Sequence, residues 1–101
     1  MRNLEPIMIT QTTIPTPKSD VIGQRMEDEA VIVTVASGTV KVLNDVGARI
    51  WELADGQRSV ADMAAIIAAE YEVTSAQALA DTLAFVEELI ARGIFAAPVG
   101  L

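Results

Sequence analysis

The sequence predicts a small α+β protein in which a three-stranded antiparallel sheet precedes three helices. Short runs rich in β-branched residues occupy positions 21–43, and amphipathic runs that begin with helix-capping residues occupy positions 44–92. A turn signal separates each run from the next. With 101 residues, the chain has the length of one domain with a modest core.

Residues 1–18 lie outside this pattern, because they hold three of the four prolines and a threonine-rich patch. Proline lacks an N–H donor and disfavours helix at the residue before it. We therefore expect a flexible N-terminal tail over 1–18 and a folded domain over 19–97. The alternative is that Ile7-Met8-Ile9 forms an extra strand or a contact segment.

The three predicted strands are VIGQRM at 21–26, AVIVTVA at 30–36 and TVKVL at 39–43. The second is almost continuously apolar, which is typical of a strand covered on both faces. Ser37-Gly38 predicts a two-residue hairpin link before the third strand. In that strand Val40 and Val42 share one face, and Lys41 lies on the other.

The three predicted helices begin at Asn44, Ser59 and Thr74, which can each accept a hydrogen bond from first-turn amides. Thr74 and Gln77 have the spacing of a capping box. Asp55-Gly56 ends the first helix after about Ala54, and Gly93 ends the third. The apolar stripes of the first two helices are Val46, Ile50 and Leu53, and Val60, Met63, Ile67 and Tyr71. Trp51, the largest apolar side chain, is expected in the core.

Composition excludes several classes of function. The 14 acidic and 7 basic residues give a net charge of −7, and the bases are scattered, which argues against nucleic-acid binding. Without His or Cys the chain lacks thiolate nucleophiles, disulfides, the usual zinc ligands and the commonest general base. We expect no enzyme activity and no cofactor. Because no apolar run approaches a membrane span and no signal peptide is visible, we expect a soluble, cytoplasmic protein.

The third helix has more apolar surface than a surface helix needs. One stripe, expected to face the core, holds Leu79, Leu83, Val86 and Ile90, and a second holds Ala78, Thr82, Phe85 and Leu89. Together they span about 160°, against the ~100° that suffices. Either the helix is deeply buried, or a groove runs beside the last strand, with Phe85 and Leu89 as its floor and Asp81 and Arg92 as its rim. A groove next to an unpaired strand edge suits an extended peptide.

A short sheet followed by three helices with a tight second turn is a winged helix-turn-helix outline. Within it, LNDVGARIWELADGQRSVADMAAIIAAEY and ALADTLAFVEELIARGIF resemble the PqqD-like family. The resemblance covers about Val21 to Phe95. Its specific elements, in order, are Leu43-Asn44, Trp51, Asp55-Gly56, Ser59-Val60, Asp81, Phe85, Leu89 and Gly93.

The resemblance implies binding of a peptide. Members of this family hold the leader of a ribosomally made precursor and present it to a modifying or processing enzyme. That enzyme is a radical S-adenosylmethionine enzyme, as in pyrroloquinoline quinone assembly, or a leader peptidase, as in lasso-peptide pathways. The leader adds as a strand to the third strand, against the third helix. The candidate peptide-binding residues are therefore Thr39, Val40, Lys41, Val42 and Leu43, and Asp81, Thr82, Phe85, Leu89 and Arg92.

Two other functions stay open on the sequence. One is a winged-helix DNA-binding regulator, although the second and third helices carry only Arg92 as a base after the cap. The other is a structural subunit that scaffolds a biosynthetic enzyme through its sheet. The open strand edge is compatible with a monomer or with a strand-exchanged dimer.

Overall fold

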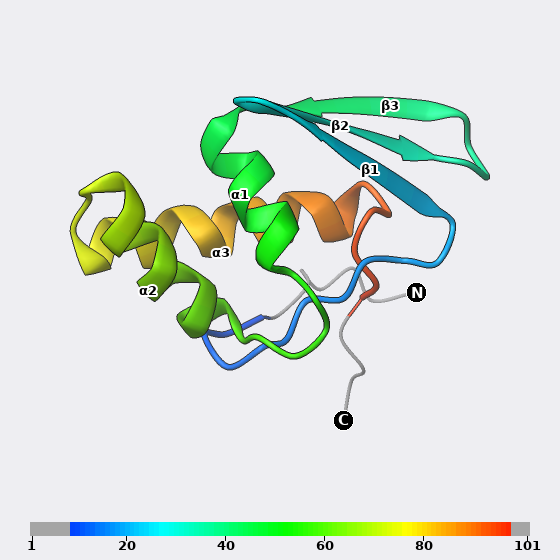
Figure 1. Cartoon of the computed structure of the whole chain (residues 1–101). Coiled ribbons are helices and arrows are strands. Elements are labelled where there is room, and N and C mark those ends of the chain that lie inside the picture. Colours follow the sequence, from blue (N-terminus) through cyan, green and yellow to red (C-terminus); the bar gives the residue numbers. More distant parts are fainter. Residues whose placement is uncertain (1–8, 98–101) are drawn as a thin grey trace.

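Three strands precede three helices in the computed structural model, which describes residues 9–97 (Figure 1). The strands are β1 (Val21–Met26), β2 (Glu29–Thr34) and β3 (Thr39–Leu43). The helices are α1 (Asp45–Leu53), α2 (Val60–Tyr71) and α3 (Ser75–Ala91). The predicted α+β order is confirmed.

The strands form one antiparallel sheet in the order β1-β2-β3. Its inner face packs toward the helices and buries Ala30, Ile32 and Leu43. Burial along β2 alternates, so the prediction that both faces of this strand are covered is wrong for the described chain. The β2–β3 link is also longer than the predicted Ser37-Gly38 pair. Thr34 pairs with Thr39 across a four-residue loop.

The helix starts follow the capping predictions. Asn44 Oδ1 accepts a hydrogen bond from the Gly47 amide at 2.9 Å. Ser59 forms a reciprocal capping box with Asp62. Thr74 accepts from the Gln77 amide at 3.1 Å, but the Gln77 side chain donates to Asp81 at 2.8 Å instead of returning to the cap.

The core face of α3 differs in part from the predicted one, because Val86 and Ile90 of the first stripe are buried as predicted but the other members are not. Thr82 and Leu89, which the sequence assigned to the second stripe, are fully buried, whereas Leu79 and Leu83 of the first stripe are only half-buried. Gly93 explains part of this difference. At φ 77° it reverses the chain, so that the amides of Ile94 and Phe95 both donate to the Leu89 carbonyl and close over the end of the helix.

Residues 9–18 pack against the body, which corrects the prediction of a free tail for this part of the chain. The carbonyls of Thr13 and Gln11 accept from the first amides of α2, at Val60 and Ala61. Pro17 forms a bridge with Phe95, and Pro15 is buried. Ile9 packs against the core. Ile7 and Met8 lie outside the described residues.

Trp51 joins the sheet to this C-terminal segment. Its ring stacks on buried Phe95 with centroids 5.8 Å apart, and its edge lies against Gly23 of β1. It is half-buried and packs against the core cluster. Between residues 9 and 97, no helix combines the length and apolar character needed to cross a membrane.

Candidate functional site: a cleft between β3 and α3

β3 pairs with β2 along one edge, and within residues 9–97 no strand pairs with its other edge. A strand in this position presents unpaired backbone N–H and C=O groups. The strand stops where Asn44 caps α1, so the open edge is five residues long. The structure therefore offers a short backbone edge that can accept hydrogen bonds from an extended chain.

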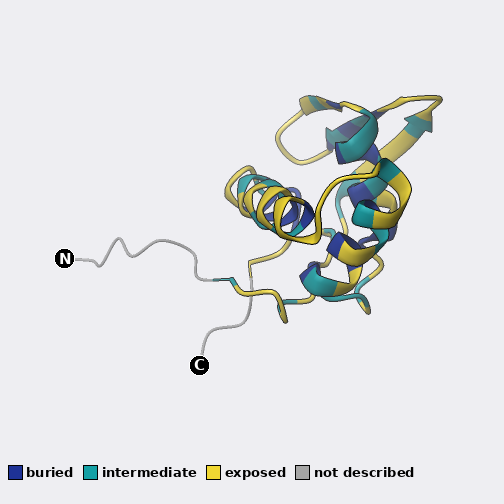
Figure 2. Ribbon diagram, turned by 90° about the vertical axis from the view of Figure 1, so that its left-hand side faces the viewer, coloured by how far each residue is buried: buried dark blue, intermediate teal, exposed yellow. Residues whose placement is uncertain are grey.

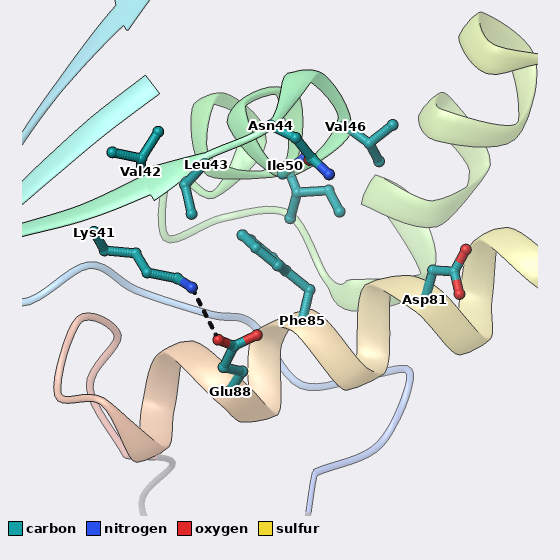
Figure 3. A pocket seen from close by; sticks show the side chains of 10 residues that line it. Lys41, Val42, Leu43, Asn44, Val46, Ile50, Asp81, Phe85 and Glu88 are labelled. Carbon is teal, nitrogen blue, oxygen red and sulfur yellow. Dashed lines mark hydrogen bonds and ion pairs between the residues drawn. The ribbon is translucent and has the colours of Figure 1, made fainter. Parts of the chain in front are cut away.

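A cleft of about 430 Å³ lies beside this edge (Figure 3). On one side it is lined by the end of β3 and by α1, and on the other by α3. The Phe85 ring projects from α3 toward Leu43 and Ile50. The lining residues are Lys41, Val42, Leu43, Asn44, Val46, Gly47, Ile50, Asp81, Phe85 and Glu88.

Gly47 determines how closely Phe85 approaches α1. A Cβ atom at this position would lie 3.1 Å from Phe85 Cε1 and 3.2 Å from Cζ. These distances are shorter than the ~3.5–4.0 Å of an ordinary carbon–carbon contact. The glycine thus leaves room for the ring between α3 and the first turn of α1.

An ion-pair cluster crosses from β3 to α3 at one end of the cleft. The Glu88 carboxylate lies 3.2 Å from Lys41 Nζ and 2.9 Å from Arg92 Nε. Hydrogen bonds from Arg92 and Lys41 hold the pKa of Glu88 below its ordinary value. Two cations surround one carboxylate here, so this end of the cleft carries excess positive charge.

Beyond this cluster lies a smaller hollow of about 200 Å³, and Lys41 lines both hollows. The smaller hollow is lined by Thr34, Thr39, Val40, Lys41, Arg92 and Ile94. At the other end of the cleft Asp81 is exposed, with Gln77 as its hydrogen-bond partner. Charge therefore changes sign along α3, from Asp81 to Arg92.

The structure brings together eight of the ten candidate residues along β3 and α3. Lys41, Val42, Leu43, Asp81 and Phe85 line the cleft, and Thr39, Val40 and Arg92 line the smaller hollow. Leu89 and Thr82 lie in the core and line neither hollow. The prediction that Leu89 forms the groove floor is wrong, because α3 is rotated to bury it.

Five of the lining residues were not predicted from the sequence: Asn44, Val46, Gly47, Ile50 and Glu88. Glu88 is three residues after Phe85 on α3, but its contact with Lys41 depends on how α3 crosses the sheet. A glycine in the first turn of a predicted helix was the only available signal for Gly47. Within the described chain, no three Asp or Glu side chains gather as a metal site would require.

A family model described as "Coenzyme PQQ synthesis protein D (PqqD)" matches residues 29–94, from the start of β2 to the end of the Gly93 turn. The chain belongs to the PqqD family. The family match covers β3, all three helices and every residue that lines the cleft. No curated protein matches the sequence.

Solved structures share the fold of this PqqD family member. "TbiB1 in Complex with the TbiA(beta) Leader Peptide" is 25% identical, with a TM-score of 0.77 over 84% of this chain and 99% of that one. "Lasso peptide synthetase B1 complexed with the leader peptide" is 26% identical, with a TM-score of 0.74 over 82% and 98%.

A solution structure of the PqqD part of Methylobacterium extorquens PqqCD has a TM-score of 0.76 at 21% identity, over 91% and 98% of the two chains. It is described as a stand-alone recognition element for ribosomally synthesized, post-translationally modified peptides. At this identity the likeness shows the fold alone.

Proposed function

We propose that this chain binds the leader segment of a ribosomally made precursor peptide as an added strand on β3 and presents it to a modifying or processing enzyme. The observation that carries the proposal is the open β3 edge beside the Phe85 cleft. Two solved structures of similar fold are described as complexes with leader peptides. Membership of the PqqD family supports the same reading.

Backbone pairing and side-chain pockets have separate roles in this mode of binding. Hydrogen bonds to the edge of β3 supply affinity for any extended chain, and pockets select alternate side chains. Phe85, Ile50 and Leu43 form the apolar part of the cleft. A leader residue that points toward α3 would therefore be apolar.

The charges along α3 define the polar part of the ligand. Asp81 and Arg92 are eleven positions apart on one helix, which is about 16 Å at 1.5 Å per residue. An extended peptide covers that length in about five residues at 3.3 Å each. The ligand favoured by this cleft has a basic residue near Asp81 and an acidic residue near Arg92, with an apolar residue between them.

The role is binding and not catalysis. The chain contains no His and no Cys, and the groups in the cleft are ion-paired or hydrogen-bonded carboxylates, cations and apolar side chains. The partner enzyme would be a radical S-adenosylmethionine enzyme or a leader peptidase, which supplies the chemistry.

Calorimetry and amide NMR with the leader encoded beside this chain test the proposal. We expect micromolar or tighter binding and amide shifts concentrated on 39–43 and on the cleft face of α3. Phe85→Ala should weaken binding by roughly 1–3 kcal/mol if Phe85 is an anchor. Val73→Ala, at an exposed residue in the α2–α3 turn, is the matched control. Shifts confined to other surfaces would exclude the cleft, and absence of binding would exclude the function.

A further inference from the structure

The face of the sheet that points away from the helices is apolar. Strand register places Ile22, Val33 and Val40 side by side across the three strands. The next row is Gln24, Val31 and Val42. Ile22 and Val40 are each 62% exposed and Val42 is 55% exposed, so this outer face presents its apolar side chains to solvent. In Figure 2 the ribbon of the sheet is coloured partly as exposed and partly as buried or intermediate, with β1 and β3 more exposed than β2.

The inner face of the sheet is already packed against the helices, so these side chains point outward. Alternation turns Gly23, Ile32 and Leu43 inward, where they meet Trp51 or the core. The sequence of β2 is that of a strand covered on both faces, yet the described chain covers only one. Apolar side chains that gather on one exposed surface mark an interaction site more often than scattered ones do.

We propose that the outer face docks onto the enzyme that acts on the bound peptide, through an apolar patch bordered by Lys or Arg on that enzyme. This inference rests on the proposed function. Three consecutive exposed carboxylates lie at one end of the outer face: Glu27 and Asp28 of the β1–β2 turn, and Glu29 at the start of β2. Opposite charges on the two partners would steer and orient docking.

The cations of the sheet lie on its other face, although Arg25 Nε also donates to the Glu27 carbonyl of the acidic turn at 2.7 Å. Arg25 and Lys41 alternate toward the inner face. There they pair with Asp45 of α1 at 2.8 Å and with Glu88 of α3 at 3.2 Å. The outer face is thus apolar at its centre and acidic at one end, and a basic border on the partner would complement it.

A second copy of the chain fits this face less well. It would bring another net charge of −7 and the same acidic turn, which adds repulsion.

A peptide strand on β3 would extend the same face, because alternate side chains of that strand would lie beside Val40 and Val42.

Biolayer interferometry with the purified enzyme encoded beside this chain tests the proposal. Ile22→Lys and Val33→Lys change the outer face on strands that do not line the cleft. Ile14→Lys, at a residue that is 49% exposed and lies outside the sheet, is the matched control. A variant with both Asp28→Lys and Glu29→Lys tests the charge argument. Circular dichroism melts and leader calorimetry are run on each variant, and Ile22→Ser replaces any lysine variant that fails to fold.

We expect Ile22→Lys and Val33→Lys to weaken enzyme binding at least tenfold and Ile14→Lys to change it less than twofold, with leader affinity unchanged in all three. The Asp28/Glu29 variant should weaken binding and reduce its salt dependence. Equal enzyme affinity for Ile22→Lys and Ile14→Lys would overturn the proposal, as would a wild-type chain that does not bind the enzyme. A dimer that Ile22→Lys dissociates would assign the face to a second copy instead. Failure of leader binding alone would reject the proposed function, whereas the measured enzyme affinities would still test the docking face.

Discussion

Gly47→Ala separates the role of the cleft from that of the fold. The added methyl group would lie 3.1–3.2 Å from the edge of the Phe85 ring and 3.2 Å from Asn44 Oδ1. An ordinary carbon contact is ~3.5–4.0 Å, so the ring must move by roughly 0.5 Å. Phe85 is half-buried and faces open space in the cleft, so it has room to give way.

Two terms of similar size act on stability. Alanine is favoured over glycine in a helix by up to ~1 kcal/mol, and a displaced, off-rotamer ring costs about 0.5–1.5 kcal/mol. We expect the free energy of unfolding in urea to stay within ~1 kcal/mol of wild type. The ring moves into the space where a ligand side chain would sit, so leader affinity should fall about three- to tenfold, which is ~0.7–1.4 kcal/mol.

A double-mutant cycle with Phe85→Ala isolates this mechanism. When the ring is absent, the methyl group at position 47 keeps only its 3.2 Å contact with Asn44 Oδ1, so the substitution should be better tolerated than in the wild-type background and should leave leader affinity unchanged. Calorimetry and urea titration on the four proteins measure both quantities. An equal loss of affinity in both backgrounds would refute the steric argument, and so would unchanged affinity in the wild-type background.

Three further predictions concern the rest of the structure. Arg92 and Lys41 lower the pKa of Glu88. The stabilisation from this cluster is therefore complete above the ordinary glutamate pKa of about 4.3 and is lost as pH falls below it. In urea titrations across this pH range, Glu88→Gln should flatten the acidic part of the stability profile. Gly23→Ala would place a methyl carbon against the Trp51 ring and should destabilise by about 1–3 kcal/mol, whereas unchanged stability would mean that Trp51 moves freely. Deleting residues 1–18 removes four backbone hydrogen bonds to α2 and to 94–96, each worth ~0.5–1.5 kcal/mol. The melting temperature should therefore fall, and an unchanged melting temperature would contradict this packing.

The sequence predicted the parts of this structure that depend on short-range chemistry. The capping bond from Asn44 to Gly47 spans three residues, and the left-handed conformation of Gly56 and Gly93 is a property of each residue alone. Such signals fix where helices begin and end. The element order and the edge position of β3 then follow, because consecutive strands joined by short turns pair with one another.

The rotation of α3 could not be predicted in the same way. A helix with an apolar surface of about 160° can be buried on either half, and the choice depends on which segments cover it. Here the Gly93 turn brings Ile94 and Phe95 back to the Leu89 carbonyl. Residues 11–13 meet α2 at Val60 and Ala61 across more than forty-five positions of sequence. Such contacts between distant segments leave no local pattern, so Leu89 was assigned to the cleft and residues 9–18 to a tail.

β3 is where the two proposed surfaces meet, and strand geometry lets both be used together. The hydrogen-bonding groups of a strand lie in the plane of the sheet, whereas its side chains stand perpendicular to it. A peptide that pairs with β3 therefore uses the backbone at 39–43, and a protein on the outer face contacts Val40 and Val42. Val42 also lines the cleft and Val40 lines the smaller hollow, but the Val42 side chain points away from α3 in Figure 3, so peptide capture and enzyme docking can occur together. The added strand would also enlarge the surface that the enzyme contacts, so each should strengthen the binding of the other.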